Sequence, residues 1–502
     1  MSAPNRRVKV LLALAGLALA ALATLAVAGT FVLSRAQGGL GAAWQAFQER
    51  HPTEMVRHAQ RRLEGHPNLE RAFGPVLLRI QAHYVHEPSR PLPDLGKGMQ
   101  PSGLPIQAYD AAGWPTPTTA PESAAAALPT QPASRMLVST EALAAALRDA
   151  MPGEVLELAP GSYRLTRRLD TGRAGTPAQP ITLRAARPGS VTLEVDTVQA
   201  LVASQPHWIF ENLVWRGVCA QDGDCEHAFH VVGVARAVVL RNNRFEDFNA
   251  AVKVNGENGY WPDAGLLQFN TFSNRRARRT DKPVTPFDLV GASHWQVLDN
   301  RVERFVKAGG NGISFGIFVK GGGEGSRIER NLVVCTPEAV AQPGQRVGIS
   351  LGGGGTDAAS CRRKPCDAEH VNGIVANNIV AHCNDSGIDV FRSPGAIVAH
   401  NTLVNTMGVS VRDAPAHAKV LANLIEGRIH LRRGGTAEAA DNTNAASLAN
   451  LLVDPDALDL RWRGIPLIVP RPERISTEFC NRLRGPASPP GATVAARCDS
   501  AP

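Results

Sequence analysis

The sequence has few large side chains and none of the common nucleotide-binding motifs. Phe, Trp and Tyr make up 5% of its 502 residues, whereas it contains 47 glycines. This composition favours thin stacked layers over a globular core of bulky residues. The sequence also lacks a phosphate-binding glycine loop, a dinucleotide-binding fingerprint and a Ser-His-Asp signature. These absences argue against nucleotide-dependent enzymes and serine hydrolases.

Lysine is scarce as well, since most of the basic residues are arginine. The formal net charge is +8, which favours an acidic partner such as a polyanionic glycan, nucleic acid or lipid headgroups. An arginine-rich composition that serves no particular partner is an equal alternative.

A short pattern returns seven times between residues 229 and 431. It reads apolar residue, two spacers, Asn, one spacer, apolar residue, and the steps between asparagines are 27, 30, 31, 47, 23 and 22 residues. Repeats of this size are typical of solenoids, and alternation such as Ile388-Asp389-Val390 predicts strands. Asparagine suits the bends because its side chain bonds nearby backbone. The pattern therefore predicts an all-β parallel β-helix with these asparagines stacked in an internal ladder: Asn243, Asn270, Asn300, Asn331, Asn378, Asn401 and Asn423.

None of the eight cysteines lies in a CxxC pair, and no histidine lies at finger spacing, which disfavours a zinc site. Three pairs are close in sequence, and Cys335 and Cys383 occupy similar positions in two repeat units. An even number favours disulfides in an oxidising compartment, with the connectivity left open. The cysteines are Cys219, Cys225, Cys335, Cys383, Cys361, Cys366, Cys480 and Cys498.

The N-terminal region predicts a membrane anchor. Residues 10–33 are uncharged and mostly apolar, and they follow Arg6, Arg7 and Lys9. That length spans a bilayer and leaves the basic flank in the cytoplasm. We expect a single-pass protein of the bacterial inner membrane with the bulk of the chain in the periplasm. The sequence Ala26-Val27-Ala28 resembles a signal-peptidase site, so secretion after cleavage stays open.

Composition divides the chain into five predicted segments. A helix from Ser139 or Thr140 to Ala150 is expected to cover the first coil, whose strand edges are otherwise unpaired. Pro52, Pro67 and Pro75 are expected to break the juxtamembrane region into short helices. The segments are a signal anchor (1–34), a helical juxtamembrane segment (35–86), a Pro/Ala-rich linker (87–134), the β-helix (135–455) and a C-terminal cap or tail (456–502).

The capping helix and residues 152–158, 161–163 and 175–183 resemble the N-terminal part of right-handed parallel β-helix proteins. Among these, the sequence is most similar to the chondroitinase-B and alginate-lyase family of polysaccharide lyases, and the resemblance covers residues 137–450. It implies right-handed coils, an acidic polysaccharide rather than nucleic acid as partner, and β-elimination from a uronate as the reaction.

Alignment of the coils by their asparagines places the preceding strands in register. Outward residues of neighbouring strands are then about 4.8 Å apart and form one polar patch. Glycine-rich turns at 321–325 and 352–355 predict an open trough beside this patch, and the insertion 356–371 predicts a wall or lid. The predicted substrate-binding residues are Lys253, Asn255, Asp288, Ser350, Asp389, Arg392 and Arg412.

The resemblance makes Lys320 the catalytic base, with its pKa lowered by Lys253 or Lys307. The family's two calcium-binding glutamates correspond to Phe315 and Ile313, and its Arg-His-Gly corresponds to residues 352–354, which are all glycine. Calcium therefore stays open as a cofactor, with no metal ligand assigned. A non-catalytic glycan-binding solenoid and a structural scaffold are the alternatives to an enzyme.

Overall fold

The computed structural model describes residues 132–492 apart from 339, 341 and 355, together with Cys498 and parts of 56–99, namely 56, 59, 60, 62, 63, 66–84, 87, 88, 90, 92, 95 and 97–99. All of them belong to one compact unit, Val56–Pro502. The predicted anchor, residues 10–33, lies outside the described residues and stays a prediction. Within the described part of the chain, no helix is both long and apolar enough to cross a bilayer.

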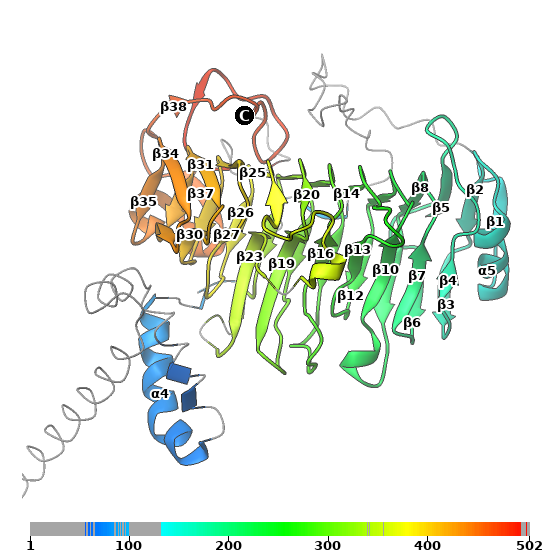
Figure 1. Cartoon of the computed structure of the whole chain (residues 1–502), viewed down its shortest axis with the longest axis horizontal. Helices are drawn as coiled ribbons and strands as arrows, with labels where there is room; N and C mark the ends of the chain where they lie inside the picture. Colours follow the sequence, from blue (N-terminus) through cyan, green and yellow to red (C-terminus); the bar gives the residue numbers. More distant parts are fainter. Residues whose placement is uncertain are drawn as a thin grey trace, which may run out of the picture. The chain divides into compact units, whose positions relative to one another are not determined.

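Three long parallel sheets form a β-helix (Figure 1). Each coil adds one strand to sheet 1, then one to sheet 2 and one to sheet 3, so neighbouring strands in a sheet come from successive coils. This confirms the predicted parallel β-helix. Sheet 1 contains β4 (Leu169–Asp170), β7 (Gln199–Ala203), β10 (His227–Val232), β13 (Val252–Asn255), β16 (Phe287–Val290), β19 (Ile313–Lys320), β23 (Gln345–Leu351), β27 (Ile388–Phe391), β30 (Gly408–Arg412) and β33 (Arg428–Arg432).

The other two sheets complete each coil. Sheet 2 contains β1 (Arg135–Leu137), β2 (Val155–Leu158), β5 (Ile181–Ala185), β8 (Trp208–Glu211), β11 (Val239–Arg241), β14 (Leu266–Gln268), β17 (Gln296–Leu298), β21 (Arg327–Glu329), β25 (Ile374–Ala376), β28 (Ala396–Ala399), β31 (His417–Leu421) and β34 (Thr436–Ala440). Sheet 3 contains β3 (Gly161–Leu165), β6 (Val191–Val195), β9 (Val214–Gly217), β12 (Arg244–Glu246), β15 (Thr271–Ser273), β18 (Arg301–Glu303), β22 (Leu332–Val334), β26 (Ile379–Ala381), β29 (Thr402–Val404), β32 (Leu424–Glu426) and β35 (Thr443–Ala445).

The predicted asparagine ladder is present at the bend between sheets 2 and 3. The side-chain oxygen of Asn270 accepts a hydrogen bond from the backbone N–H of Asn243 at 3.0 Å, and Asn300 does the same for Asn270 at 2.9 Å. The ladder continues to Asn442, which bonds Asn423 at 3.0 Å. The left-handed backbone conformation belongs to the residue before each ladder asparagine, as at Asp299 with φ 57°. Each asparagine therefore fixes the register between two coils.

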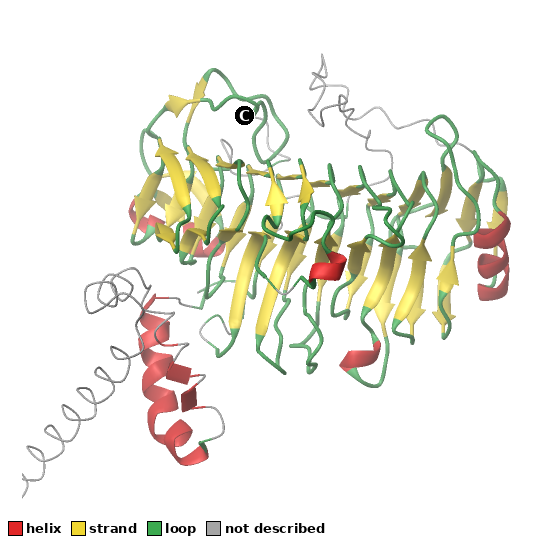
Figure 2. Cartoon of the chain, in the orientation of Figure 1, coloured by secondary structure: helices red, strands yellow, loops and turns green. Residues whose placement is uncertain are grey.

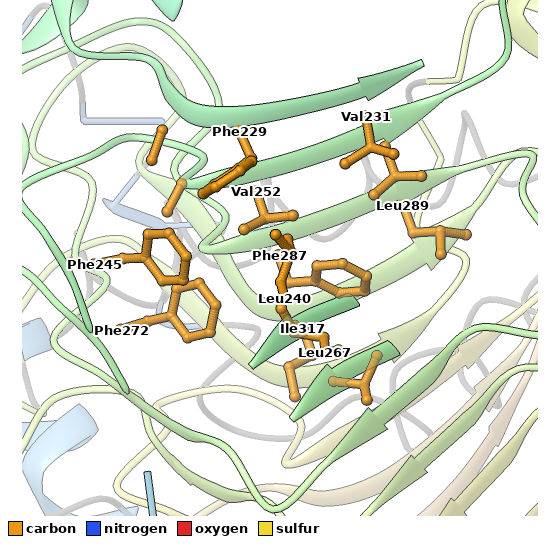
Figure 3. Close-up of a cluster of buried hydrophobic side chains, with 14 of the residues drawn as sticks. Phe229, Val231, Leu240, Phe245, Val252, Leu267, Phe272, Phe287, Leu289 and Ile317 are labelled. Atoms are coloured by element: carbon orange, nitrogen blue, oxygen red, sulfur yellow. The ribbon is translucent and has the colours of Figure 1, made fainter. Parts of the chain in front are cut away.

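The interior of the coils holds the inward-facing apolar residues of the strands. Figure 3 shows part of this core, with Phe245 and Phe272 from successive coils lying one on the other and Phe229 nearby. The rings of Phe245 and Phe272 stack with centroids 4.8 Å apart. A column of like side chains at the strand spacing gives thin layers of core, which is how a chain with few aromatic residues fills its interior.

The N-terminal end of the stack is closed by α5 (Thr140–Asp149) (Figure 2). The Ser139 hydroxyl caps this helix by accepting from the Ala142 N–H at 3.1 Å, and the helix buries Leu143, Ala146 and Leu147. The cap is the one predicted. Another prediction was wrong, because Pro75 lies inside α4 (Pro67–Tyr84) instead of ending it.

The C-terminal segment turns sideways and covers sheet 3. It contains η4 (Leu448–Asn450), η5 (Pro455–Ala457) and the hairpins β36 (Leu452–Asp454) with β37 (Asp459–Trp462) and β38 (Val469–Pro470) with β39 (Ala487–Ser488). Leu452, Leu460 and Phe479 join Leu332 and Val404 of sheet 3 in one buried cluster. The segment is therefore a lateral cover and not a cap over the last coil.

All eight cysteines form disulfides, so none of them is a thiolate ligand for zinc. The pairs are Cys219–Cys225, Cys335–Cys383, Cys361–Cys366 and Cys480–Cys498. The first flanks η2 (Asp222–Asp224) and the third lies in the insertion, which also contains η3 (Ala358–Ser360). The insertion returns to the stack where β24 (His370–Val371) pairs with β20 (Gly323–Glu324).

Candidate functional site

The register of sheet 1 is the predicted one, so its outward residues form columns. Lys253 lies beside Asp288 on neighbouring strands, and Lys320 lies beside Val290. Ser350 and Asp389 follow in the same column as Asp288. The first column is His230, Lys253, Asp288, Phe318, Ser350, Asp389, Ser410 and His430.

Two lysines share one buried carboxylate at the centre of this face. The Lys253 ammonium is ion-paired with one oxygen of Asp288, and the Lys320 ammonium lies 4.0 Å from the other oxygen. The Asp288 side chain is 4% exposed and that of Lys320 is 13% exposed. We call these three residues the lysine cluster. With both lysines protonated, it holds one positive charge in excess.

The cluster shifts the protonation of its members. Burial lowers the pKa of Lys320, and the Lys253 charge lowers it further, against the opposing effects of Asp288 and Glu369. Burial alone would raise the pKa of Asp288, but the two lysines outweigh it and lower that pKa. Lys307 takes no part, because its ammonium donates to the Asp281 carbonyl at 2.9 Å instead. Lys320 is thus closer to a neutral amine than an exposed lysine is.

Aromatic rings line the other side of Lys320. Its ammonium lies 4.4 Å from the centroid of the Phe318 ring, and Phe318 stacks on Phe315 at 4.1 Å. Phe315 and Ile313 offer no oxygen where the resembling lyases place calcium ligands. Among the described residues, no group of three or more His, Cys, Asp or Glu is placed to hold a metal ion. The residues present at this position do not fit calcium.

Asn255 contacts His230, which is not among the predicted binding residues. His230 Nε2 lies within hydrogen-bond distance of the Asn255 side-chain oxygen, and His230 Nδ1 lies 3.3 Å from Gln199 Oε1. Burial lowers the pKa of His230 to about 4, so it is neutral at physiological pH. The asparagine alignment of the sequence already places His230 one coil before Lys253. That position could have identified His230 as part of the site.

The remaining predicted binding residues lie elsewhere. Asp389 is bonded to Arg412 at 2.9 and 2.7 Å, and the Arg412 guanidinium stacks over Phe391 at 4.3 Å. This pair forms a second group, with Asp389 four coils and Arg412 five coils beyond Lys253.

Two of the predicted binding residues are not available to a ligand. Ser350 is fully buried and its hydroxyl donates to the Gly352 carbonyl, so it offers nothing to a ligand. Arg392 has a left-handed backbone, φ 48°, and donates to the Cys366 carbonyl at 2.8 Å. It therefore holds the insertion and does not face the sheet.

The expected open trough is filled by the insertion itself. Gly322 N–H donates to the Glu369 carbonyl at 2.8 Å, and Gly321 N–H donates to the Glu369 side chain at 3.1 Å. A Cβ on Gly352 would lie 2.1 Å from the Phe391 carbonyl. The glycines are therefore needed for close backbone packing and not for an empty groove. The prediction of a trough was wrong, while the insertion does form a wall next to Lys320.

Arg362 anchors this wall. Its guanidinium makes a bidentate pair with Asp263 at 2.6 and 2.9 Å, donates to Ser293 at 3.0 Å, and lies 5.2 Å from the Trp261 ring. Trp261 is thus covered, whereas Tyr260 beside it is 61% exposed. Tyr260 is the aromatic ring that remains free to stack on a sugar at the edge of the patch.

Comparison with known proteins adds the following. No protein-family model matches the sequence, and no curated protein matches it. Solved structures that are similar include a PL6-family polysaccharide lyase from Pseudopedobacter saltans, with 13% identity, 62% of this chain and 92% of that chain covered, and a TM-score of 0.34. A pectate lyase has 14% identity, 70% and 90% coverage and a TM-score of 0.45. An alginate lyase from a Paenibacillus species has 16% identity, 62% and 95% coverage and a TM-score of 0.36.

Proposed function

We propose that the protein binds an acidic polysaccharide on the outward face of sheet 1 and cleaves it by β-elimination, with Lys320 as the base. The observation that carries this proposal is the lysine cluster, in which Lys253 and Lys320 share the buried carboxylate of Asp288. While Lys320 is protonated, the cluster carries one surplus positive charge, which attracts the carboxylate of a uronate. The lowered pKa of Lys320 raises the fraction of neutral amine that can accept a proton.

The chemistry needs a base and a stabilising cation. Neutral Lys320 takes the proton next to the uronate carboxylate, and the electron pair forms a carbon–carbon double bond as the bond to the leaving oxygen breaks. That oxygen takes a proton from water. The Lys253 ammonium stabilises the enolate charge that develops in between. No step is assigned to calcium, because Ile313 and Phe315 supply no ligand.

Absorbance of the unsaturated product tests the catalytic step. Wild-type protein mixed with a panel of polyuronates should raise the absorbance near about 235 nm, and Lys320→Ala should lower this rate by at least ~100-fold. Lys320→Arg is the matched control, because it keeps the positive charge but cannot act as a base near neutral pH. It should bind the polyuronate and fail to cleave it.

Non-catalytic binding is the second candidate, favoured by the insertion that packs against the glycine turns beside Lys320. Binding of a polyuronate without any absorbance change would establish it in place of catalysis. Unchanged binding in both Lys320→Ala and Lys253→Ala would remove the lysine cluster as the site.

For the location, we infer an inner-membrane protein anchored by residues 10–33, with the β-helix in the periplasm. The four disulfides support an oxidising compartment. The full-length chain should stay with the membrane pellet after alkaline extraction. Recovery of a shortened chain in the soluble fraction would show cleavage near Ala28 and secretion instead.

A further inference from the structure

Within the part of the chain that the structure describes, the C-terminal end of the stack is open. β33, β34 and β35 are the final strands of the three sheets, so among the described strands each has a neighbour on one side only. Leu431 faces inward in register with Val411, yet Leu431 is 44% exposed and Val411 is fully buried. The described part of the C-terminal segment packs on the side of sheet 3 and pairs with none of these strand edges. A strand edge with exposed apolar side chains is a template for pairing with another chain.

The other end of the stack is closed, which limits what can pair with the open one. α5 buries Leu143 and Leu147 against the first coil, so a second copy cannot continue the stack head to tail. Two open ends can meet only about a two-fold axis perpendicular to the stack. Such an axis makes the facing strands antiparallel and closes the assembly at two copies.

We propose that this end is a dimer interface, in which β33 pairs antiparallel with β34 of a second copy while β35 pairs with β35 of that copy. A two-fold axis that brings sheet 1 of one copy onto sheet 2 of the other also brings sheet 3 of one copy onto sheet 3 of the other. The interface therefore extends each of the three sheets across the axis and leaves no strand of the last coil unpaired.

Side-chain size fits one register. With His430 opposite Glu438 of the second copy, both residues lie on the outward face of the sheets. The inward residues then pair large with small: Ile429 with Ala439 and Leu431 with Ala437. The same strands alternate inward and outward in step with Val409, Val411, Ala418 and Val420 of the preceding coil, which are fully buried. A slip of one residue would oppose inward and outward side chains and is disfavoured.

Charge selects the same pairing. The outward residues of β33 are Arg428, His430 and Arg432, whereas the only charged residue of β34 is Glu438, followed directly by Asp441. In this register Glu438 lies between the two arginines of the other copy, and Asp441 comes next to Arg428. Pairing β33 with β33 of the second copy would instead place Arg428 opposite Arg432. Directly opposed like charges are destabilising.

A cysteine at the centre of β35 tests the interface. All eight native cysteines are in disulfides, so Asn444→Cys in the full-length protein adds the only free thiol. This thiol should face the thiol at the same position of the second copy across the axis. Mild oxidation should give a covalent dimer at least ~10-fold faster than Val138→Cys, because pairing raises the effective thiol concentration to the millimolar range. Val138 is the control, since it is 73% exposed but lies at the closed end.

Charge reversal supplies the second measurement. Among the described residues of its own copy, the exposed Glu438 carboxylate is ion-paired with His417 and Lys419. Glu438→Arg should therefore keep the wild-type circular dichroism spectrum, while its unfolding midpoint should fall to that of wild-type protein diluted until it dissociates. In the Asn444→Cys background it should slow cross-linking by at least ~10-fold, and in sedimentation it should convert the wild-type dimer to a monomer. The proposal is wrong if Asn444→Cys cross-links no faster than Val138→Cys, if Glu438→Arg leaves the rate unchanged, or if the wild-type protein sediments as a monomer.

Discussion

The lysine cluster depends on a single carboxylate. Asp288 is nearly inaccessible, and its two oxygens face the ammonium groups of Lys253 and Lys320. Because those charges hold the pKa of Asp288 below its ordinary value, the carboxylate stays ionised at neutral pH. Its contribution to stability is present above the unfolded-state pKa and is lost as pH falls through the lower folded-state pKa.

Asp288→Asn should destabilise the fold, because it keeps the shape of the side chain and leaves two neighbouring ammonium groups without their counter-charge. We expect the free energy of unfolding to fall by about 2 kcal/mol, less than for a fully buried pair because both lysines keep some water. Urea denaturation measures this. Asp288→Asn with Lys253→Met removes one of the two cations and should recover much of the loss. A wild-type midpoint in Asp288→Asn would show that the carboxylate does not hold the lysines.

A buried histidine should make stability depend on pH. His370 is fully buried, and its Nε2 accepts a hydrogen bond from Ser326 N–H at 3.2 Å. Burial lowers its pKa from 6.5 to about 3, so between these values the unfolded chain binds a proton that the folded chain does not. Stability therefore falls as pH is lowered from about 6.5, by about 1.4 kcal/mol per pH unit for this one group.

His370→Gln keeps a hydrogen-bond acceptor and removes the titrating group. The slope of unfolding free energy against pH, measured between about pH 4 and 6, should decrease by the contribution of one proton. It should not reach zero, because His227 and His400 are also held neutral by burial, with pKa values of about 4 and 3. Equal slopes in the variant and the wild type would mean that His370 is protonated in the folded protein.

At the scale of elements, the asparagine ladder joins each coil to the next. Asn331 accepts from both the backbone N–H and the side-chain N–H of Asn300, each at 2.9 Å, and donates to the Val297 carbonyl at 2.8 Å. Asn331→Ala would remove four buried hydrogen bonds: those donated by the backbone and the side chain of Asn300, and those accepted by the Val297 and Glu329 carbonyls. We expect a loss of about 3 kcal/mol in the free energy of unfolding.

Asn442→Ala provides the matched comparison for this effect. Asn442 makes the same bonds to Asn423 at the open end, but it is only partly buried. Water can replace its hydrogen bonds, so the cost should be below about 1 kcal/mol. Equal losses of unfolding free energy in the two variants would show that burial does not set the cost of losing these hydrogen bonds.

The same ladder explains how much could be predicted from the sequence. Because one asparagine per coil fixes the register, the column from His230 to Asp389 followed from spacing alone. The course of the insertion did not follow, since it is set by Arg362 binding Asp263, 99 residues away, and no periodicity links those two. The glycine turns were therefore interpreted as an empty trough when they are packing surfaces. Ser350 was misplaced for a related reason, because an outward position in a strand is not always exposed.

For the whole molecule, one residue that precedes the β-helix and one that follows it contact each other in a buried charged network on its side. Lys97 pairs with Asp299 at 2.8 Å, Arg330 pairs with Asp299 at 3.0 Å, and the Lys97 ammonium lies over the Phe479 ring at 4.4 Å. Burial lowers the pKa of Lys97. Burial alone would raise the pKa of Asp299, but Arg330 and Lys97 together lower it. Asp299 thus connects residues 97–99 and the C-terminal segment to sheet 2.

Asp299→Asn should release this cover before the coils unfold. It removes the ion-pair partner of buried Lys97 and leaves Arg330 with its ion pair to Glu329, a change that costs about 3–5 kcal/mol. A stack of coils is held by nearest neighbours, so the loss should stay local. Hydrogen exchange should rise first in residues 97–99 and 475–492, with β16 and β19 still protected. Asp413→Asn, which breaks an exposed pair with Arg433, should change exchange little. Simultaneous loss of protection in the cover and in the central coils would mean that the chain unfolds as one cooperative unit, with Asp299 as part of its common core.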